Sequence, residues 1–299
     1  MNLLDLNNLN TSHLKDLYSL TDDIKLNQAK YSNTLNGKTI LSCFFEPSTR
    51  TQISFEMAVR KLGGNFIKFD PNLSSLKKSE SIIDTLKTFK EYQPDFLIIR
   101  SPYSGMAQIA ANILSNTHII NAGDGMNSHP TQALIDSYTI LKRLNTINNL
   151  KIGICGDIIR NRVAHSNIEL LGKILNNKIY LIAPPSMLPK FISQDYKIYH
   201  NINCLKDINL DVLMSLRIQN ERKKIAFNLQ DYKKNYQINE NALNIEKIPI
   251  ILHPGPVNIN IEITEEVLNY KNIMINEQVK NSIYMRQAIM YFLMNPSLN

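Results

Sequence analysis

The sequence predicts an α/β protein made of two open parallel-sheet α/β domains. Short β-branched runs alternate with segments of helical period, which is typical of parallel α/β architecture. The 299 residues suffice for two domains of ordinary size, each with its own core. A polar break at residues 145–149, Asn-Thr-Ile-Asn-Asn, interrupts the series and suits a domain boundary. We therefore expect one domain at residues 1–144 and another at 145–279.

Four apolar, β-branched runs in the first domain predict strands, and four segments of helical period follow them. The expected strands are 39–45, 65–69, 96–100 and 118–121. The expected helices are 51–62, 81–92, 106–114 and 130–144. Pro130 suits the first turn of the last helix, because its missing N–H would be unpaired there in any case.

A second α/β series follows the polar break. Its expected strands are 151–155, 178–182, 212–215 and 249–252, with a helix at 163–175. Residues 283–293 are strongly apolar and of helical period, which predicts one more helix near the end of the chain.

Composition excludes several classes of protein. The chain is 43% hydrophobic and 20% charged, and no apolar run approaches the ~18 residues of a membrane span. The formal charge of +7 could suggest nucleic acid, but the basic residues are dispersed among acidic ones and no recognition motif accompanies them. We expect neither a membrane nor a nucleic-acid partner.

The N-terminus and the cysteines both indicate a cytoplasmic protein. The first seven residues are polar and acidic, whereas a secretory signal is basic and then apolar. Cys43, Cys155 and Cys204 are scattered, with no close pair to suggest a disulfide framework or a zinc site. We expect them to behave as small buried hydrophobic residues.

Residues 45–51 predict a phosphate cradle at the junction of a strand and a helix. Pro47 stops the strand, Ser48 is a good N-cap, and the backbone N–H groups of Thr49, Arg50 and Thr51 are then unpaired first-turn donors. Such a terminus attracts anions, to which Arg50 adds a planar fork of donors and Thr51 a hydroxyl. From these residues alone, a capped helix with a solvent-facing arginine is an equal alternative.

Arg100 and His129 are candidate catalytic residues, although a capping or core histidine is the better interpretation of His129 taken alone. Arg100 closes an apolar strand, and a charged residue at that place favours a ligand role over a surface one. His129 follows an expected flexible loop at residues 123–125, Gly-Asp-Gly, and lies at a helix start, where the dipole disfavours a charged imidazole. A neutral His129 could join Arg100 and Thr51 in stabilising an oxygen that gains negative charge.

Five strings in register resemble the transcarbamoylase family, in its aspartate branch. The first is Phe-Phe-Glu-Pro-Ser-Thr-Arg-Thr at residues 44–51, followed by Ser-Phe-Glu at 54–56. The others are residues 121–125 with 129–136, 156–157 with 162–167, 217–222, and 253–258. Together they span nearly the whole chain.

The resemblance implies a function and a set of site residues. The implied reaction transfers the carbamoyl group of carbamoyl phosphate to the amine of L-aspartate, without cofactor or metal, in a cleft between the domains. The implied carbamoyl-phosphate ligands are Ser48, Thr49, Arg50, Thr51, Ser74, Arg100, His129, Gln132, Gly255 and Pro256. The implied aspartate ligands are Lys78, Arg162, Arg217 and Gln219. The implied catalytic residues are Arg50, Thr51, Lys78, Arg100 and His129.

The resemblance also implies an assembly. In the family, a Ser and a Lys of one loop reach the active site of the neighbouring subunit, and they map to Ser74 and Lys78 in the polar stretch 74–81. A homotrimer with shared active sites is therefore expected, and regulatory chains or a dihydroorotase are further partners that the resemblance allows. The last helix, with residues 280–299, is expected to return to the first domain.

The sequence departs from the family pattern at three places, and three alternatives stay open. Ser79 and Ser282 replace frequent glycines, and Ile259 replaces a frequent arginine. The alternatives are another transcarbamoylase such as that of ornithine, a dinucleotide-binding protein suggested by Gly153 and Gly156, and a non-catalytic scaffold. Two arginines favour a dicarboxylate over a cationic substrate, and the glycine pattern of a dinucleotide site fails at Cys155 and Ile159.

Overall fold

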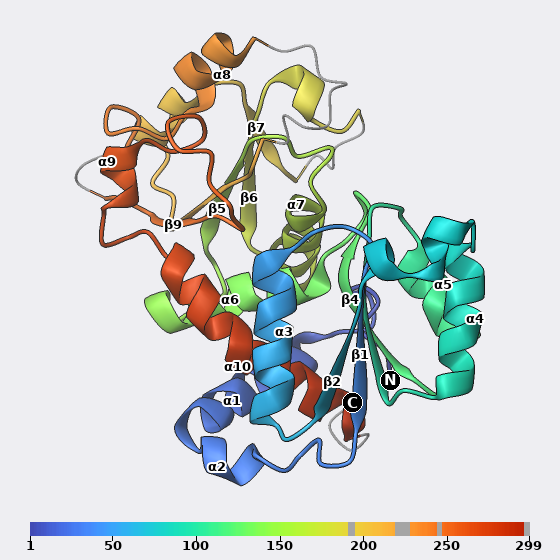
Figure 1. The fold of residues 1–299 in the computed structure, drawn as a ribbon. Coiled ribbons are helices and arrows are strands. Elements are labelled where there is room, and N and C mark those ends of the chain that lie inside the picture. The colour runs from blue at the N-terminus through green and yellow to red at the C-terminus, as the bar shows by residue number, and fades with distance from the viewer. Residues whose placement is uncertain (191–194, 219–227, 244–246, 296–299) are drawn as a thin grey trace. The chain divides into compact units, whose positions relative to one another are not determined.

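The computed structural model describes residues 1–190, 195–218, 228–243 and 247–295. The chain divides into two compact units. Unit 1 comprises Met1–Ile135 with Val279–Asn299, and unit 2 comprises Asp136–Gln278. Each unit holds one parallel sheet flanked by helices, so the predicted fold class is confirmed (Figure 1).

The sheet of unit 1 has the order β2-β1-β3-β4 within the described residues, and all its pairs are parallel. Its strands are β1 (Thr39–Phe44), β2 (Asn65–Phe69), β3 (Phe96–Ser101) and β4 (His118–Asp124). The N-terminal segment covers the edge of β4, because the Leu3 N–H donates to Ile119 O and Leu3 O accepts from the Asn121 N–H, both at 2.9 Å. The four predicted strands are therefore confirmed.

Helices cover both faces of this sheet. They are α1 (Thr11–Leu26), α2 (Gln28–Tyr31), α3 (Thr49–Lys61), α4 (Ile82–Tyr92) and α5 (Met106–Ile113), followed by α6 (Pro130–Leu144) at the junction with unit 2. On one face, Leu86 and Phe89 of α4 and Ala110 of α5 share a buried core with Leu97 and Ile99 of β3. Helices α1, α3 and α10 lie on the opposite face (Figure 1).

The last helix, α10 (Ile275–Met294), packs back on unit 1 as predicted. Its Phe292 ring lies 5.8 Å from the His13 ring, and its Tyr291 ring lies 5.4 Å from the Tyr31 ring. The helix begins eight residues before the predicted start, because buried polar residues such as Gln278 interrupt the apolar pattern there. No helix in the described ranges is both long and apolar enough to cross a membrane.

The sheet of unit 2 has the order β7-β6-β5-β8-β9 in the described part of the chain, again with parallel pairs. Its strands are β5 (Lys151–Cys155), β6 (Lys178–Ile182), β7 (Lys197–Tyr199), β8 (Val212–Ser215) and β9 (Ile250–Leu252). The helical segments are α7 (Arg162–Asn167), the π-helical η3 (Ile168–Ile174), α8 (Leu229–Tyr236) and α9 (Glu265–Leu268). The predicted helix 163–175 is thus an α-helix that continues as a π-helix. Strand β7 was missed because its three residues are exposed or only partly buried, so no apolar run marks it.

The cysteines are buried to different degrees. Cys43 and Cys155 are fully buried, and burial raises the pKa of each thiol. Cys204 is partly buried, and burial raises the pKa of its thiol to about 11. Because the thiolate is the reactive form, all three residues are chemically quiet at neutral pH.

Candidate functional site

The strand order of unit 1 places the predicted phosphate cradle beside Arg100. Strand β1 has β2 as its neighbour on one side and β3 on the other, so the chain connections from β1 and β3 lead in opposite directions along the sheet. A topological switch point therefore lies between β1 and β3. In open parallel sheets, ligands bind beyond the carboxyl ends of the strands at such a point. Phe44, the last residue of β1, pairs in register with Arg100, and the Phe45 N–H donates to Arg100 O at 2.9 Å.

The cradle consists of the first turn of α3. The helix begins at Thr49, two residues before the predicted start. Ser48 is its N-cap, as predicted, but the Ser48 hydroxyl makes no capping hydrogen bond. The Gln52 N–H is the first to bond within the helix, to Ser48 O at 3.0 Å, so the N–H groups of Thr49, Arg50 and Thr51 precede the intrahelical ladder. Thr51 is buried and Arg50 is exposed. This turn offers backbone, hydroxyl and guanidinium donors to an anion.

Arg100 is held in place by two groups. Its Nε lies 2.8 Å from Glu46 Oε1, and its Nη1 donates to Ala122 O at 3.1 Å. The side chains of Arg100 and Glu46 are both mostly buried, so the guanidinium has a fixed orientation at the end of β3. Glu46 was not among the predicted site residues. The signal that could have found it is an acidic residue inside a motif that is predicted to bind an anion.

His129 lies directly before α6, as predicted, and is buried with 4% of its surface exposed. Its Nδ1 lies 3.3 Å from Thr131 Oγ1, and its carbonyl accepts from the N–H groups of Gln132 and Ala133 at 3.0 and 3.3 Å. The backbone of His129 therefore takes part in the first turn of α6. Its neutral state stays a prediction.

The expectation of a flexible loop at residues 123–125 is wrong. Gly123 and Asp124 end β4 and are buried. The Asp124 carboxylate accepts from the N–H groups of Gly105 at 2.9 Å and Met106 at 3.0 Å, and from Asn127 Nδ2 at 3.1 Å. Asp124 therefore supplies the cap that α5 lacks locally and ties the segment before His129 to that helix.

The segment with Ser74 and Lys78 is structured locally. It forms the 3-10 turns η1 (Pro71–Leu73) and η2 (Ser75–Lys78). The Ser74 hydroxyl donates to Pro71 O at 2.8 Å and accepts from the Leu76 N–H at 3.3 Å. Ser79 follows with a φ of 71°, in the left-handed region that favours glycine, so this serine takes the strained conformation that a glycine adopts freely. Lys78 is exposed and pairs with none of the described residues.

Unit 2 presents a second switch point, between β5 and β8, and both predicted arginines follow it. After β5, Asn161 Oδ1 accepts from the N–H groups of Val163 at 2.9 Å and Ala164 at 3.3 Å, which starts α7 at the buried Arg162. After β8, the Leu216 N–H donates to Cys155 O at 2.8 Å, and the partly buried Arg217 comes next.

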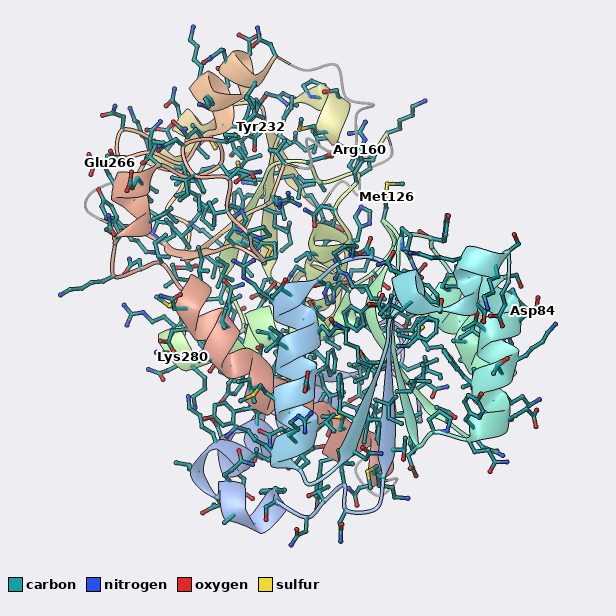
Figure 2. The ribbon with its side chains drawn as sticks, viewed as in Figure 1. Asp84, Met126, Arg160, Tyr232, Glu266 and Lys280 are labelled. Carbon is teal, nitrogen blue, oxygen red and sulfur yellow. The ribbon has the colours of Figure 1, made fainter. Side chains whose placement is uncertain are left out.

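Two features fix the loop between β5 and α7. Gly156 has a φ of 124°, and a Cβ there would lie 3.0 Å from Leu216 Cβ, so the turn requires glycine. Arg160 Nη1 lies 3.3 Å from Oδ1 of the buried Asp157 (Arg160 is labelled in Figure 2). The glycine turn at Gly156 and the ion pair between Arg160 and Asp157 thus fix the backbone that leads to Arg162.

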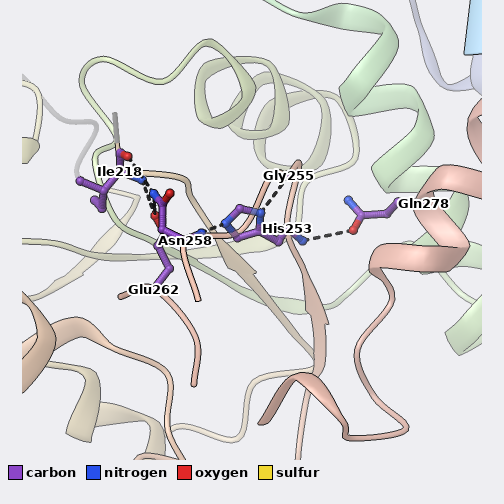
Figure 3. A network of polar contacts seen from close by, with 6 residues as sticks. All are labelled: Ile218, His253, Gly255, Asn258, Glu262 and Gln278. Carbon is purple, nitrogen blue, oxygen red and sulfur yellow. Dashed lines mark hydrogen bonds and ion pairs between the residues drawn. The ribbon is translucent and has the colours of Figure 1, made fainter. Parts of the chain in front are cut away.

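A buried carboxylate joins the segment after Arg217 to the segment at 253–258 (Figure 3). Glu262 Oε1 accepts from the Ile218 N–H at 2.8 Å and from Asn258 Nδ2 at 2.7 Å, and Oε2 accepts from the Asn258 N–H at 2.6 Å. His253 Nε2 lies 3.7 Å from Oε2. Glu262 was not predicted as a member of the site, since its partners lie up to 44 residues away.

The same network shapes the turn that presents Gly255 and Pro256. The Gly255 N–H donates to His253 Nδ1 at 2.8 Å, and the His253 N–H donates to Gln278 Oε1 at 3.1 Å. Gly255 has a φ of 66°, and its peptide bond to Pro256 is cis. Both residues lie beyond the end of β9, on the same edge of the sheet as Arg217.

The structure thus places most of the predicted ligands at strand ends of their own unit. Unit 1 carries Ser48, Thr49, Arg50, Thr51, Ser74, Lys78, Arg100, His129 and Gln132. Unit 2 carries Arg162, Arg217, Gly255 and Pro256. Gln219 lies outside the described residues. Among those described, no group of three or more His, Cys, Asp or Glu side chains could hold a metal ion.

Comparison with known proteins gives the family. Residues 1–142 match the family model described as aspartate/ornithine carbamoyltransferase, carbamoyl-P binding domain, and residues 148–293 match the one described as Asp/Orn binding domain. The aspartate carbamoyltransferase catalytic subunit of Ehrlichia chaffeensis is 43% identical over 98% of this chain and 97% of its own length. That of Dehalococcoides mccartyi is 40% identical over 97% of this chain and 90% of its own length.

Solved structures agree. Aspartate transcarbamoylase from Trypanosoma cruzi, in complex with N-(phosphonacetyl)-L-aspartic acid, has a TM-score of 0.87 at 28% identity over 97% of this chain and 94% of its own. The catalytic subunit from M. jannaschii has a TM-score of 0.85 at 34% identity over 98% and 97%. Fold and comparisons define an α/β transferase of two compact units, each built on one parallel sheet. The chain belongs to the aspartate/ornithine carbamoyltransferase family.

Proposed function

We propose that the chain catalyses the transfer of the carbamoyl group from carbamoyl phosphate to L-aspartate, as the catalytic subunit of an aspartate carbamoyltransferase. The observation that carries this proposal is the placement of predicted anion ligands at the switch points of both sheets: Arg50 and Arg100 in unit 1, and Arg162 and Arg217 in unit 2. The product, N-carbamoyl-L-aspartate, belongs to de novo pyrimidine biosynthesis.

Unit 1 is proposed to bind carbamoyl phosphate. The first turn of α3, with Ser48, Thr49, Arg50 and Thr51, holds the phosphate through backbone N–H groups, hydroxyls and one guanidinium. Arg100 and His129 donate to the carbamoyl oxygen together with Thr51. Gln132, on the first turn of α6, accepts from the carbamoyl NH2.

Unit 2 is proposed to bind aspartate. Its two carboxylates need two fork-like cations at defined positions, for which arginine suits better than lysine. Arg162 and Arg217 supply them, with Gln219 and Lys78 as further ligands. The carbonyl oxygens of Gly255 and Pro256 accept from the carbamoyl NH2.

The chemistry needs alignment more than activation. The α-amine of aspartate attacks the carbamoyl carbon, a C–N bond forms, the C–O bond to phosphate breaks, and the amine proton passes to the departing phosphate. Carbamoyl phosphate is already activated, so no cofactor is required. Holding two mutually repellent anions together can contribute about 7 kcal/mol or more through proximity alone. A site shared by the two domains stays a prediction.

A product assay tests the proposal. The purified chain is incubated with carbamoyl phosphate and either L-aspartate or L-ornithine, and products are measured by mass spectrometry alongside phosphate release. We expect N-carbamoyl-L-aspartate with the first amino acid and no citrulline with the second, because paired arginines repel a cationic side chain. Citrulline formation, or no transfer to either amino acid, would contradict the proposal.

We further propose a homotrimer in which Ser74 and Lys78 serve the site of the neighbouring subunit. Two observations support it: Lys78 is exposed, and it pairs with none of the described residues of its own chain. The Ser74 hydroxyl already bonds Pro71 O and the Leu76 N–H, so Lys78 is the stronger candidate. The cytoplasmic location, and regulatory chains or a dihydroorotase as partners, remain predictions.

Subunit complementation tests the shared site. When inactive Arg50→Ala and Lys78→Ala chains are co-assembled in equal amounts, random trimers should regain about a quarter of wild-type activity, since one site in four combines an intact Arg50 with an intact neighbouring Lys78. The matched control mixes Arg50→Ala with His129→Ala chains. In the proposal one subunit supplies both residues to a site, so every site in this mixture lacks one of them and no activity should return. Equal recovery in both mixtures, or in neither, would refute sharing.

A further inference from the structure

The buried cation of α10, Arg286, has no role in the site described above. Only 2% of its surface is exposed. It pairs with no carboxylate among the described residues, although an arginine this deeply buried usually has an acidic partner. Its position in the fold therefore needs an explanation.

The hydrogen bond and the ring contact of Arg286 both lead to α3. Its Nη1 donates a short hydrogen bond to Ser54 Oγ. Its guanidinium carbon lies 4.6 Å from the centroid of the Phe55 ring, which is a favourable cation–π distance. Its Nε is buried without a hydrogen-bond partner.

Ser54 passes this contact on to the first turn of α3. Its hydroxyl lies 2.6 Å from Arg50 O and 3.0 Å from Thr51 O, and it can donate to either carbonyl while accepting from Arg286. A chain of hydrogen bonds therefore runs from the buried guanidinium to the backbone of the residues that carry the proposed phosphate cradle.

No described carboxylate pairs with the guanidinium of Arg286. Burial and, to a smaller extent, the positive charge of Arg100 together lower the pKa of this guanidinium to about 9. Glu46 offsets part of the charge of Arg100, but Arg100 still repels the buried guanidinium of Arg286, and the protein without ligand bears this cost. An anion at the α3 terminus, next to Arg100, would reduce it.

We propose that Arg286 is a positioning residue for the phosphate half-site: through Ser54 it fixes the first turn of α3, and its buried charge adds to the attraction of a dianionic phosphate that it does not touch. This inference rests on the proposed function, because it takes the α3 terminus as the phosphate site. It predicts that the occupancy of that site and the charge at position 286 are energetically coupled.

The test measures the binding of inorganic phosphate to the intact protein by calorimetry, together with melting temperatures with and without phosphate. We expect Arg286→Met to weaken phosphate binding at least tenfold and to raise the KM for carbamoyl phosphate by a similar factor, with less than a threefold change in the KM for aspartate. Arg286→Lys keeps the charge but not the planar fork, and its phosphate affinity should lie between those of the wild type and Arg286→Met. The control Arg60→Met removes an exposed charge from the last turn of α3 and should bind phosphate like the wild type.

The outcomes separate this inference from the proposed function. A purely structural role would lower the melting temperature of Arg286→Met equally with and without phosphate and leave its phosphate affinity unchanged, which would overturn the inference. If Arg286→Met does not fold, the phosphate affinity of Ser54→Ala is measured instead. A phosphate affinity equal to that of the wild type overturns the inference, and a weaker one supports it. A wild-type chain that bound no phosphate would instead refute the proposed function.

Discussion

The substitution Arg50→Ala should lower kcat/KM for carbamoyl transfer by about a hundredfold to a thousandfold, because it removes a donor that the proposed site directs at the charge of the transferring substrate, and loss of one such donor costs about 3 to 4 kcal/mol. Stability should not change. The Arg50 side chain is exposed and pairs with none of the described residues, so its loss should alter the free energy of unfolding by no more than about 0.5 kcal/mol. Steady-state kinetics and urea denaturation give the two values.

Two variants make this result specific. Arg60→Ala removes a second arginine from the same helix, one that pairs with Glu56 on the surface, and should retain wild-type turnover. Arg50→Lys keeps the charge without the planar fork and should remain strongly impaired, because a point charge cannot replace bidentate recognition. An Arg50→Ala enzyme with near-normal kcat/KM would show that the α3 terminus is not the phosphate site.

The substitution Glu262→Ala should lower the free energy of unfolding by about 3 to 5 kcal/mol, the usual cost of breaking a buried charged network by removing one member. The carboxylate accepts from two backbone N–H groups and from the Asn258 side chain. Both N–H groups would lose their partner, and Asn258 Nδ2 would keep only its bond to Ile218 O. Chemical denaturation followed by circular dichroism measures the effect.

The milder Glu262→Gln tests what this network does for binding. One carboxylate oxygen becomes an NH2 group that faces a donor, so the segments at Ile218 and Asn258 should loosen while the fold persists. We expect the KM for aspartate to rise about tenfold, because a small displacement of a binding group is costly. Glu266→Gln, at an exposed carboxylate four residues on, is the control and should match the wild type. Unchanged aspartate kinetics in Glu262→Gln would show that Arg217 is positioned by other contacts.

Most strands and several helices could be predicted because their signals are local. Strands β2, β5, β6 and β8 have the predicted bounds, since an apolar β-branched run between polar breaks is read within a few residues. The N-terminal helix α1 was missed although Asn10 and His13 form a capping box, because its apolar residues are spread among polar ones. The early start of α10 was missed for the same reason.

The site could be predicted in part. The residues that contact substrate in the proposal stand in contiguous strings next to strand ends, so Arg50, Arg100 and His129 could be named from the sequence. The residues that hold them could not. Glu46 pairs with Arg100 across 54 positions, and Asp124 caps a helix that starts 18 residues before it. Such partners leave no periodic signal in the chain.

The sequence by itself determined the alternation of strands and helices, the family and the chemical types of the proposed ligands, because these depend on neighbouring residues along the chain. The tertiary structure alone decided which strands are neighbours and so where each switch point lies. It also decided that Glu262 joins two distant segments and that Arg286 supports α3 from a helix 232 residues away from Ser54. Burial and hydrogen bonding over such separations arise when the sheets assemble, and short-range patterns carry no record of them.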